Sequence, residues 1–320
     1  MQRSLAAIVP TMDRPDRLRA ALESVRDQTH DAVEAVVVDG GDEPAEQVVD
    51  ELRDDGLAVT YVRNDAPQGL PAARNQGAAA TDADVLGFLD DDDRWRPDFA
   101  EAHLAALDDG AALSYCGFTS VTPDGDVVHV RRPTRSGDLY EDLLVRNVVG
   151  PPSTVAVRRS VFDAVDGFDE SLDHQEDWAF YLTVADRDGP AAAVTGDGGP
   201  RIAAISEPLT ERLHHDDAMS RDVAAQKRGR ERILERNDDA LRARGLRDAA
   251  WSAHHRKAGV TRCLSGDTAG GRREFLASLR HRPRPGVAVL LALALTGPRG
   301  FRVAVAVKRR LVTAAAATST

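Results

Sequence analysis

Residues 85–97 read Val-Leu-Gly-Phe-Leu-Asp-Asp-Asp-Asp-Arg-Trp-Arg-Pro. A continuous apolar run of this length is typical of a strand that is buried on both faces of a sheet. The run stops at four consecutive aspartates, Asp90 to Asp93. We therefore predict a buried strand over residues 85–89 whose carboxyl end carries a group of carboxylates.

Upstream of this strand, apolar runs alternate with amphipathic segments. The runs, predicted as strands, cover residues 5–9, 35–38 and 59–62, and the segments, predicted as helices, cover residues 15–26, 44–52 and 71–80. Strands and helices that alternate in this way form a parallel sheet with right-handed crossovers. Ligands of such sheets lie beyond the carboxyl ends of the strands. The residues that follow the strands, 11–14, 39–42 and 90–93, are therefore the candidates for a site.

Downstream of residue 95 the pattern becomes mixed. We expect a helix over residues 99–107, a strand over 111–118 and a turn at Pro123-Asp124-Gly125. From residue 219 onward, charged helical patterns cover residues 223–244, 249–264, 269–280 and 287–295. We therefore predict one domain over residues 1–218 and a helical C-terminal region over 219–320. Within the domain, residues 1–97 form a regularly alternating half and residues 98–218 a mixed half.

The composition narrows the class of protein. The 320 residues carry a formal net charge of -11, and lysine occurs only at Lys227, Lys257 and Lys308. An acidic, lysine-poor surface is typical of adaptation to high salt and repels nucleic acid, so we expect a halophilic protein that binds no nucleic acid. The two cysteines, Cys116 and Cys263, have no spacing typical of a disulfide framework or a zinc site, which favours a reducing cytoplasm.

The apolar segments bear on localisation. The first one is only strand-length and predicts no signal peptide, and the apolar residues 287–295 are far shorter than the roughly 20 needed to span a bilayer. A cytoplasmic protein is expected. Residues 287–295 and the basic, apolar residues 301–311 have the composition of a tail that lies on a membrane surface. The alternative is a helix pair that covers the protein core.

The aspartates themselves predict a metal site. Carboxylates in a loop can ligate Mg2+ or Mn2+ together with diphosphate oxygens, so that the ion neutralises the departing phosphate. Asp92 is the first candidate ligand and Asp90 the second. The competing interpretation is a solvated acidic turn in an Asp-rich chain.

A second acidic group follows at the start of a predicted helix. Gly167-Phe168-Asp169-Glu170 precedes Glu176-Asp177-Trp178. Acidic residues stabilise helix N-termini, which alone would explain either carboxylate. The functional interpretation is a general base that removes the proton of an attacking hydroxyl.

Five segments, in order from Ile8 to Asp177, resemble the family 2 glycosyltransferases with the GT-A fold. The first is Ile8-Val9-Pro10-Thr11 with Asp13-Arg14-Pro15, which is similar to the family's first strand and nucleotide-contacting turn. The second is Val36-Val37-Val38-Asp39-Gly40-Gly41, in which Asp39 matches the first acid of the second strand and the two glycines depart from the pattern. The resemblance implies that Pro10, Thr11, Arg14 and Asp39 contact the nucleotide.

The third segment, Gly69-Leu70-Pro71-Ala72-Ala73-Arg74-Asn75-Gln76-Gly77, resembles the family's Gly-Leu-x-x-Ala-Arg-Asn-x-Gly segment. It implies that Arg74 and Asn75 support the nucleotide site. The fourth, Asp90 to Asp93, falls on the Asp-x-Asp metal motif and adds Asp90 and Asp91 to the donor-binding residues. The fifth contains Glu176 and Asp177, and implies Asp177 as the base with Glu176 orienting the acceptor or the loop.

The resemblance also implies the fold and the reaction. Residues 1–218 would be the catalytic domain, with residues 1–97 binding the nucleotide-sugar and residues 98–218 the acceptor. The fold would be an α/β, mostly parallel sheet flanked by helices, with a Rossmann-like nucleotide-binding half and a C-terminal helical appendage. The reaction would be an inverting transfer from a nucleotide-sugar, by family default UDP-linked, to a glycan or lipid-linked acceptor hydroxyl. His214 lies where many relatives carry a histidine near the diphosphate, so it is a third candidate metal ligand. An exposed histidine in a polar loop is the alternative.

Three other classes of protein make different predictions. A nucleotidyltransferase of nucleotide-sugar synthesis needs a glycine-rich, basic loop after the first strand, where this chain has Thr11-Met12-Asp13-Arg14-Pro15. A dehydrogenase needs GxGxxG at the same place, and that motif is absent. A non-catalytic sugar-binding member of the family would have lost the metal or base carboxylates, and both sets are present.

Overall fold

The computed structural model describes residues 3–43, 45–64, 67–196, 198–213 and 223–305. The chain divides into two compact units. Unit 1 comprises Met1–Tyr140 and Val148–Asp216, and unit 2 comprises Glu141–Asn147 and Asp217–Thr320. The predicted domain boundary at residue 218 lies among residues 214–222, outside the described residues, and stays a prediction, as does the division of the catalytic domain at residue 97.

The first half of unit 1 is a parallel sheet. Its strands are β1 (Leu5–Thr11), β2 (Val33–Asp39), β3 (Val59–Arg63) and β4 (Val85–Phe88), in the spatial order β3-β2-β1-β4. The strand β1 is buried along its whole length, as expected for a central parallel strand. In its register with β2, Thr11 lies opposite Asp39, so two predicted site residues meet at the carboxyl edge of the sheet. The four predicted strands and their parallel pairing are confirmed.

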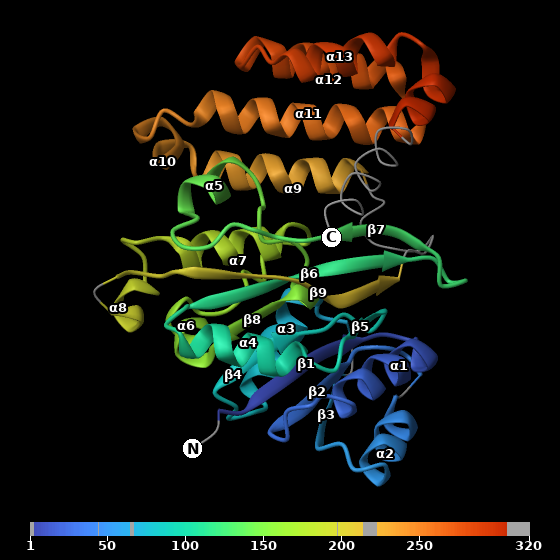
Figure 1. The fold of residues 1–320 in the computed structure, drawn as a ribbon, viewed down its shortest axis with the longest axis vertical. Helices are drawn as coiled ribbons and strands as arrows, with labels where there is room; N and C mark the ends of the chain where they lie inside the picture. The colour runs from blue at the N-terminus through green and yellow to red at the C-terminus, as the bar shows by residue number, and fades with distance from the viewer. Residues whose placement is uncertain (1–2, 44, 65–66, 197, 214–222, 306–320) are drawn as a thin grey trace. The chain divides into compact units, whose positions relative to one another are not determined.

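Helices cover both faces of this sheet (Figure 1). One face packs against α1 (Pro15–Arg26), α2 (Glu46–Asp54) and α4 (Phe99–Asp108), whose buried apolar residues share one core with alternate residues of β1 and β2. The other face packs against α3 (Leu70–Ala79), α6 (Arg159–Ala164) and α7 (Glu176–Ala185). Gly77 brings α3 close to β1, because a Cβ there would lie 2.5 Å from Cγ2 of Ile8.

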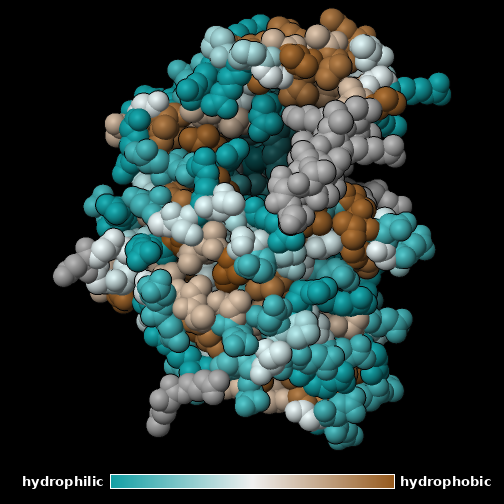
Figure 2. Space-filling model, viewed as in Figure 1, coloured by the Kyte–Doolittle hydropathy of each residue, from teal (hydrophilic) through white to brown (hydrophobic). Residues whose placement is uncertain are grey.

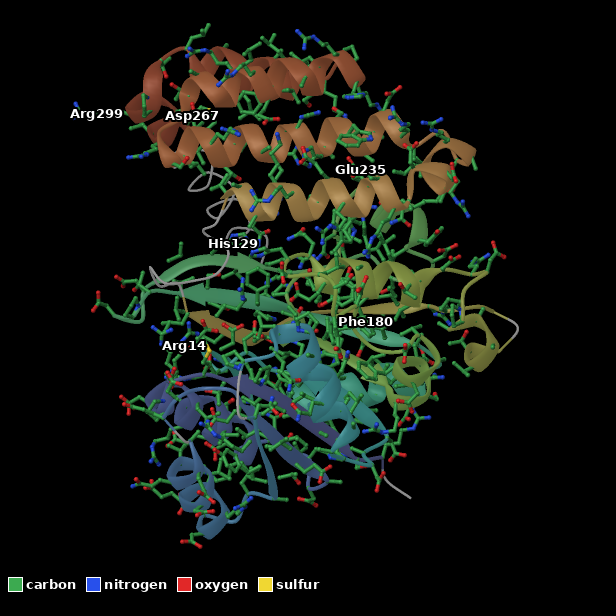
Figure 3. The ribbon with its side chains drawn as sticks, turned by 180° about the vertical axis from the view of Figure 1, so that it is seen from behind. Arg14, His129, Phe180, Glu235, Asp267 and Arg299 are labelled. Carbon is green, nitrogen blue, oxygen red and sulfur yellow. The ribbon has the colours of Figure 1, made fainter. Side chains whose placement is uncertain are left out.

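An aromatic cluster forms the core on this second face. Phe88 of β4 meets Phe168 edge to face at a centroid distance of 4.9 Å, and Phe168 stacks on Phe180 of α7 at 4.5 Å. Phe162 of α6 completes the cluster at 5.7 Å from Phe180, which is labelled in Figure 3. The predicted buried strand therefore anchors the helix that carries the second acidic group.

The second half of unit 1 extends the sheet with mixed pairing. The added strands are β5 (Asp93–Trp95), β6 (Leu113–Val121), β7 (Val127–Arg131), β8 (Val155–Arg158) and β9 (Ile202–Leu213). Only β6 and β9 pair in parallel among them, and β4 joins this half by antiparallel pairing with β8. The predicted turn at Pro123-Asp124-Gly125 joins β6 to β7, with Gly125 at a positive φ of 87°. Short helices lie at η1 (Pro152–Thr154) and α8 (Ala192–Thr195).

Unit 2 is helical. It contains α9 (Val223–Arg236), α10 (Asp238–Ala243), α11 (Arg247–Ser265), α12 (Thr268–His281) and α13 (Pro285–Ala294), as well as most of α5 (Tyr140–Val145). Two glycines let α11 and α12 approach closely, because a Cβ on Gly259 would lie 2.5 Å from Cε1 of Phe275 and one on Gly271 2.2 Å from Cys263 Sγ. The predicted C-terminal helices are confirmed, with the first one divided at Asn237. No helix in the described ranges is long and apolar enough to cross a membrane.

Candidate functional site

The four aspartates that follow β4, Asp90 to Asp93, form a tight turn, which we call the acid turn. The backbone N–H of Asp93 donates to the carbonyl of Asp90 at 3.0 Å, and β5 begins at Asp93. Carboxylate oxygens of Asp90, Asp92 and Asp93 lie within 4.8 Å of one another. Three carboxylates at this spacing provide the hard oxygen ligands that Mg2+ and Mn2+ prefer. The donor set therefore fits a divalent cation, and it contains both predicted ligands, Asp92 and Asp90, and also Asp93.

Asp91 points toward the first strand. Its Oδ2 accepts a hydrogen bond from Thr11 Oγ1 at 2.9 Å, and its Oδ1 lies 3.3 Å from Nη1 of Arg14. Burial raises the pKa of Asp91 to about 6, and the Thr11 hydroxyl and the Arg14 guanidinium oppose that rise. The structure therefore brings three of the predicted donor-binding residues, Thr11, Arg14 and Asp91, into contact.

Asp93 is paired with an arginine from a distant strand. The strands β5 and β9 are antiparallel, and their register sets Asp93 opposite Arg212. Arg212 Nε lies 3.3 Å from Asp93 Oδ2, and its guanidinium stands over the Phe118 ring at 5.4 Å. Burial raises the pKa of Asp93 to about 7 against the opposing effect of Arg212, with the neighbouring Asp90 and Asp92 adding to the rise. The neighbouring carboxylates of the turn therefore act together on Asp93.

Arg74, on α3, connects the two acidic groups. Its side chain is 1% exposed, with Nη2 2.8 Å from Asp90 Oδ1 and Nη1 2.8 Å from Glu176 Oε1. Burial disfavours its charge, yet the two carboxylates raise the pKa of Arg74 above its ordinary value. The guanidinium also stands over the Phe168 ring at 5.4 Å. A charged, fixed arginine therefore sets the distance between the acid turn and the start of α7.

Asn75, the next residue of α3, fixes the loop before α7. Its Oδ1 accepts from the backbone N–H of Phe168 at 2.8 Å, and its Nδ2 donates to the carbonyl of Phe168 and to Glu170 Oε1, both at 2.9 Å. Gly167 is required beside it, because a Cβ there would lie 2.5 Å from Asn75 Oδ1 and the residue has a φ of +65°. The matched Arg-Asn pair therefore holds both ends of the second acidic segment.

The second acidic pair begins α7. Gln175, just before it, has a left-handed backbone with φ 66°, which turns the chain so that Glu176 and Asp177 open the helix. Asp177 is half-buried, and its Oδ1 accepts from the backbone N–H of Trp178 at 2.7 Å. Tyr181, one turn later, is fully buried, and burial together with the charge of Asp177 raises its pKa above the ordinary value. Its hydroxyl has no hydrogen-bond partner within the described residues.

Asp39 is held entirely by the protein. It is 0% exposed, and it accepts hydrogen bonds from the backbone N–H groups of Gly41 and Ala45, each at 2.9 Å, and from the Tyr61 hydroxyl at 2.7 Å. Arg63 Nη1 lies 2.9 Å away. These partners lower the pKa of Asp39 despite its burial. It thereby fixes the start of α2, and its contact with the nucleotide stays a prediction.

The structure brings most of the predicted site residues together at the carboxyl ends of β1, β2 and β4. They are Pro10, Thr11, Arg14, Asp39, Arg74, Asn75, Asp90, Asp91, Asp92, Glu176 and Asp177. His214 lies outside the described residues and stays a prediction. No local pattern predicts Arg212, or Ser153, whose hydroxyl accepts from the backbone N–H of Asp90 at 3.2 Å. Both residues reach the turn from distant parts of the chain, through tertiary contacts that local patterns do not encode.

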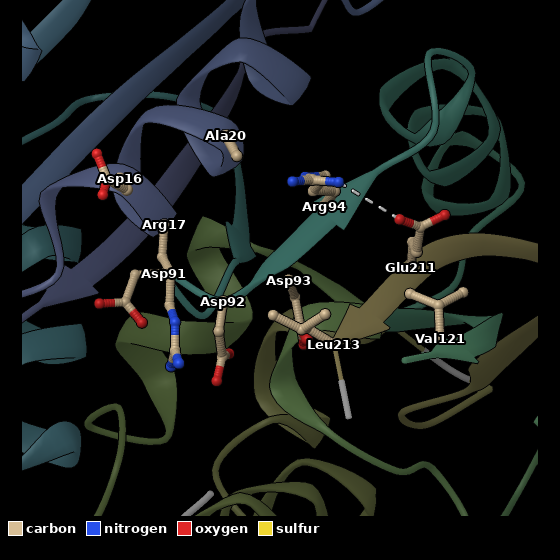
Figure 4. A pocket seen from close by; sticks show the side chains of 10 residues that line it. All are labelled: Asp16, Arg17, Ala20, Asp91, Asp92, Asp93, Arg94, Val121, Glu211 and Leu213. Carbon is tan, nitrogen blue, oxygen red and sulfur yellow. Dashed lines mark ion pairs between the residues drawn. The ribbon is translucent and has the colours of Figure 1, made fainter. Parts of the chain in front are cut away.

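A pocket opens on one side of the acid turn (Figure 4). Asp91, Asp92 and Asp93 line it together with Asp16 and Arg17 from the first turn of α1, and the remaining lining residues are Ala20, Arg94, Val121, Glu211 and Leu213. Arg94 Nη1 lies 3.6 Å from Glu211 Oε1 across the β5–β9 pair. A small polar ligand in this pocket would therefore meet the carboxylates of the turn.

The sequence of the chain matches a known family and several of its members. Residues 6–165 match the model of glycosyl transferase family 2. An uncharacterised glycosyltransferase of Haemophilus influenzae is 30% identical over 190 residues, which are 56% of this chain and 60% of that protein. A glucosyl-dolichyl phosphate glucuronosyltransferase of Haloferax volcanii is 28% identical over 55% of this chain and 59% of that protein. The chain thus spans about three fifths of the length of these relatives.

Solved structures show the same fold. TarS residues 1–349 of S. aureus in complex with UDP-GlcNAc give a TM-score of 0.59 at 16% identity, covering 93% of this chain and 89% of that one. A mannosyltransferase of Pyrobaculum calidifontis, in complex with GDP-Man and Mn2+, gives 0.54 at 18% identity, covering 97% and 87%. The expected α/β fold with flanking helices and a helical C-terminal region is confirmed. This chain belongs to glycosyl transferase family 2 and has the GT-A fold.

Proposed function

We propose that this chain is a metal-dependent, inverting glycosyltransferase that moves a sugar from a nucleotide diphosphate to an acceptor hydroxyl. The observation that carries the proposal is the Arg74 bridge, because it ties the acid turn to the acidic start of α7 through two contacts of 2.8 Å. A donor held at the turn would then present its sugar toward Asp177. Residues 1–97 would bind the donor and residues 98–218 the acceptor.

The acid turn would bind the donor diphosphate through Mg2+ or Mn2+. Asp92, Asp90 and Asp93 would hold the ion, which when bound neutralises negative charge on the departing phosphate. Arg74 engages only Oδ1 of Asp90, so the other oxygen of that carboxylate is left for a cation. Thr11 and Arg14 anchor Asp91 and so fix the turn on the first strand. His214 would complete the shell.

Asp177 would act as the general base. It would accept the proton of the acceptor hydroxyl as that oxygen attacks the anomeric carbon from the face opposite the leaving diphosphate, which inverts the configuration. Arg74 holds the neighbouring Glu176 in place, and that carboxylate would orient the acceptor. Asn75 fixes the loop that precedes both residues.

The donor and acceptor are proposed by class. A UDP-linked sugar is supported by the UDP-GlcNAc complex of a structure with the same fold, while the mannosyltransferase complex with GDP-Man keeps GDP-sugars in the test panel. A lipid-linked acceptor is supported by the name of the Haloferax volcanii relative. We therefore propose a role in glycan or glycolipid assembly.

A donor panel tests the proposal. The purified full chain is incubated with Mn2+ or Mg2+ and a set of UDP-, GDP- and dTDP-sugars, and release of the nucleoside diphosphate is measured with and without EDTA. We expect release from one donor class, abolished by EDTA. A protein that binds donors but releases nucleotide from none of them would be a sugar-binding member. Pyrophosphate formed from a nucleoside triphosphate and a sugar phosphate would instead indicate a nucleotidyltransferase.

An Asp177→Asn variant tests the base. A positioned base contributes about 10²- to 10⁴-fold to the rate, so turnover should fall by that factor while donor affinity stays near the wild-type value. Asp173→Asn is the matched control, because Asp173 is exposed and lies four residues earlier, in the loop that precedes α7. Near-normal turnover of Asp177→Asn would remove this residue from the base role.

A further inference from the structure

The helix α13 is apolar on every side. Its sequence, Pro-Gly-Val-Ala-Val-Leu-Leu-Ala-Leu-Ala, contains no charged or hydrogen-bonding side chain. One side is buried: Val287 and Ala294 share a core with Phe275 of α12 and with Phe301. A helix that is apolar all round is normally buried all round or placed in a lipid environment. The side of α13 that faces away from this core therefore needs an explanation.

The other side of α13 is exposed. The residues Ala288, Val289, Ala292 and Leu295, which we call the outer face, are spaced so that they fall on one side of the helix. Val289 is 58% exposed and Leu295 70%. Figure 2 shows apolar side chains gathered over α13. Exposed apolar residues are common singly, but a contiguous row on a helix marks a surface that contacts an apolar partner.

The charged residues that flank the outer face in the sequence are all positive. No acidic residue follows Glu274 in the sequence, although the whole chain has a net charge of -11. Arg282 and Arg284 precede the helix, and Arg299 and Arg302 follow it; all four are exposed. An apolar face flanked by arginines at both ends is the pattern of a helix that lies in the interface of a membrane.

More positive charge gathers at the start of α13. Burial lowers the pKa of Arg256 on α11, and the guanidiniums of Arg146 and Arg284 lower it further. Within the described ranges, none of these three arginines forms an ion pair with a carboxylate. Like charges that lack an internal counterion favour an anion from outside the chain.

We propose that unit 2 binds an anionic lipid bilayer, with the outer face of α13 at the boundary of headgroups and acyl chains. The flanking arginines would lie at the level of the lipid phosphates. Leu295 and Val289 would be the most deeply inserted side chains, because they are the most exposed apolar residues of the row. This attachment would bring the protein to a lipid-linked acceptor, but it does not depend on the proposed transfer reaction.

A second copy of the chain is a poorer fit for this surface. Two outer faces that met would bring the same arginines against each other, and like charges in apposition weaken association. An anionic bilayer satisfies both the apolar row and the arginines, whereas a neutral bilayer satisfies only the row. Charge complementarity therefore favours the anionic bilayer. The experiment below distinguishes it from a neutral bilayer and from a second copy of the chain.

The test is vesicle co-sedimentation of the full chain at about 0.15 M salt, with vesicles of phosphatidylcholine alone or mixed with phosphatidylglycerol. We expect binding to the mixed vesicles and little binding to the neutral ones. Val289→Asp/Leu295→Asp should abolish pelleting. Arg282→Gln/Arg284→Gln should lower the partition coefficient about twenty-five-fold, since each arginine near an anionic surface contributes about fivefold. The matched control is Val127→Asp/Val130→Asp on β7, another exposed apolar row in unit 1.

Hydrogen exchange keeps the test decisive if a variant is unstable. Amides of residues 286–296 should become protected in the wild-type chain only when anionic vesicles are added. Protection without vesicles that grows with protein concentration, together with dimer formation in sedimentation velocity, would show that a second copy covers the face and would overturn the proposal. Equal binding to neutral vesicles, or none to either, would also overturn it. Release of the nucleoside diphosphate from the donor, measured without lipid, tests the transfer reaction separately from membrane binding.

Discussion

Among the residues that the structure describes, two arginines are buried, and they are held in opposite ways. Arg74 in unit 1 has carboxylates at 2.8 Å on two of its nitrogens, and its Nε alone lacks a partner. Arg230 in unit 2 is 6% exposed, and its Nε and Nη1 are buried without a hydrogen-bond partner in the described chain. Burial lowers the pKa of Arg230, whereas two carboxylates raise that of Arg74.

The contrast distinguishes Arg74, whose charge holds two carboxylates in place, from Arg230, whose side chain contributes mainly buried volume. A buried charge is tolerated when hydrogen-bonded counter-charges surround it, and removing one partner leaves the others unpaired. Arg74 is such a centre, because Asp90 and Glu176 both depend on it. No carboxylate of the described residues forms an ion pair with Arg230, so its removal leaves none of them unpaired.

The largest expected effect is that of Arg74→Met. The change leaves Asp90 and Glu176 with like charge and no bridge, so we expect unfolding free energy to fall by about 3–5 kcal/mol and donor turnover to be lost. Urea unfolding and the donor assay measure the two effects.

Arg74→Lys sharpens this prediction. Lysine keeps the charge but cannot make two directed contacts from a planar group, so stability should partly return while turnover stays low. Full turnover in Arg74→Lys would show that charge alone, not the double contact, sets the site.

The next effect is a pH dependence carried by one buried histidine in each unit. Burial lowers the pKa of His103 in unit 1 and of His254 in unit 2 to about 3. The unfolded chain, with a histidine pKa of about 6.5, therefore binds more protons than the folded one at mildly acidic pH. Stability is complete above about pH 6.5 and should fall, as pH drops toward 3, by about 1.4 kcal/mol per pH unit for each histidine.

Urea unfolding at pH 7.0 and 5.5 checks this dependence. Tryptophan fluorescence follows it, because Trp95 and Trp178 lie in unit 1 and Trp251 lies in unit 2. His103→Leu should reduce the pH slope of the unit 1 transition, and His254→Leu that of unit 2. If the pH dependence of unfolding were unchanged in both variants, these two histidines would not be its cause.

The smallest effect is that of Arg230→Met. Methionine fills the same space without a charge that must be dehydrated, so we expect stability to stay constant or rise by about 1 kcal/mol. Turnover should not change. A loss of stability comparable to that of Arg74→Met would erase the contrast between the two arginines.

The strands and helices that could be predicted from the sequence are those whose own residues show a clear apolar pattern. The first strands and helices have apolar periodicity of their own, so β1 to β4 and α1 to α4 lie where expected. The acid turn and the start of α7 were found because their residues are adjacent in the chain.

Contacts between distant segments were not predictable in this way. Arg212 is separated from Asp93 by 119 residues, and they meet only because β9 pairs with β5 in one register. The membership of Glu141–Asn147 in unit 2 also depends on tertiary packing alone. Arg74 was found through a family pattern, but its bridge to two carboxylates became visible only in the structure.

The central claim is that the acid turn holds a divalent cation together with the donor diphosphate. Calorimetric titration of UDP and GDP into the full chain, with Mn2+ and with EDTA, tests it most directly. We predict Mn2+-dependent binding of one nucleotide that Asp92→Asn weakens at least about tenfold. Nucleotide binding that is equally tight with Mn2+ and with EDTA, and unchanged in Asp92→Asn, would contradict this claim.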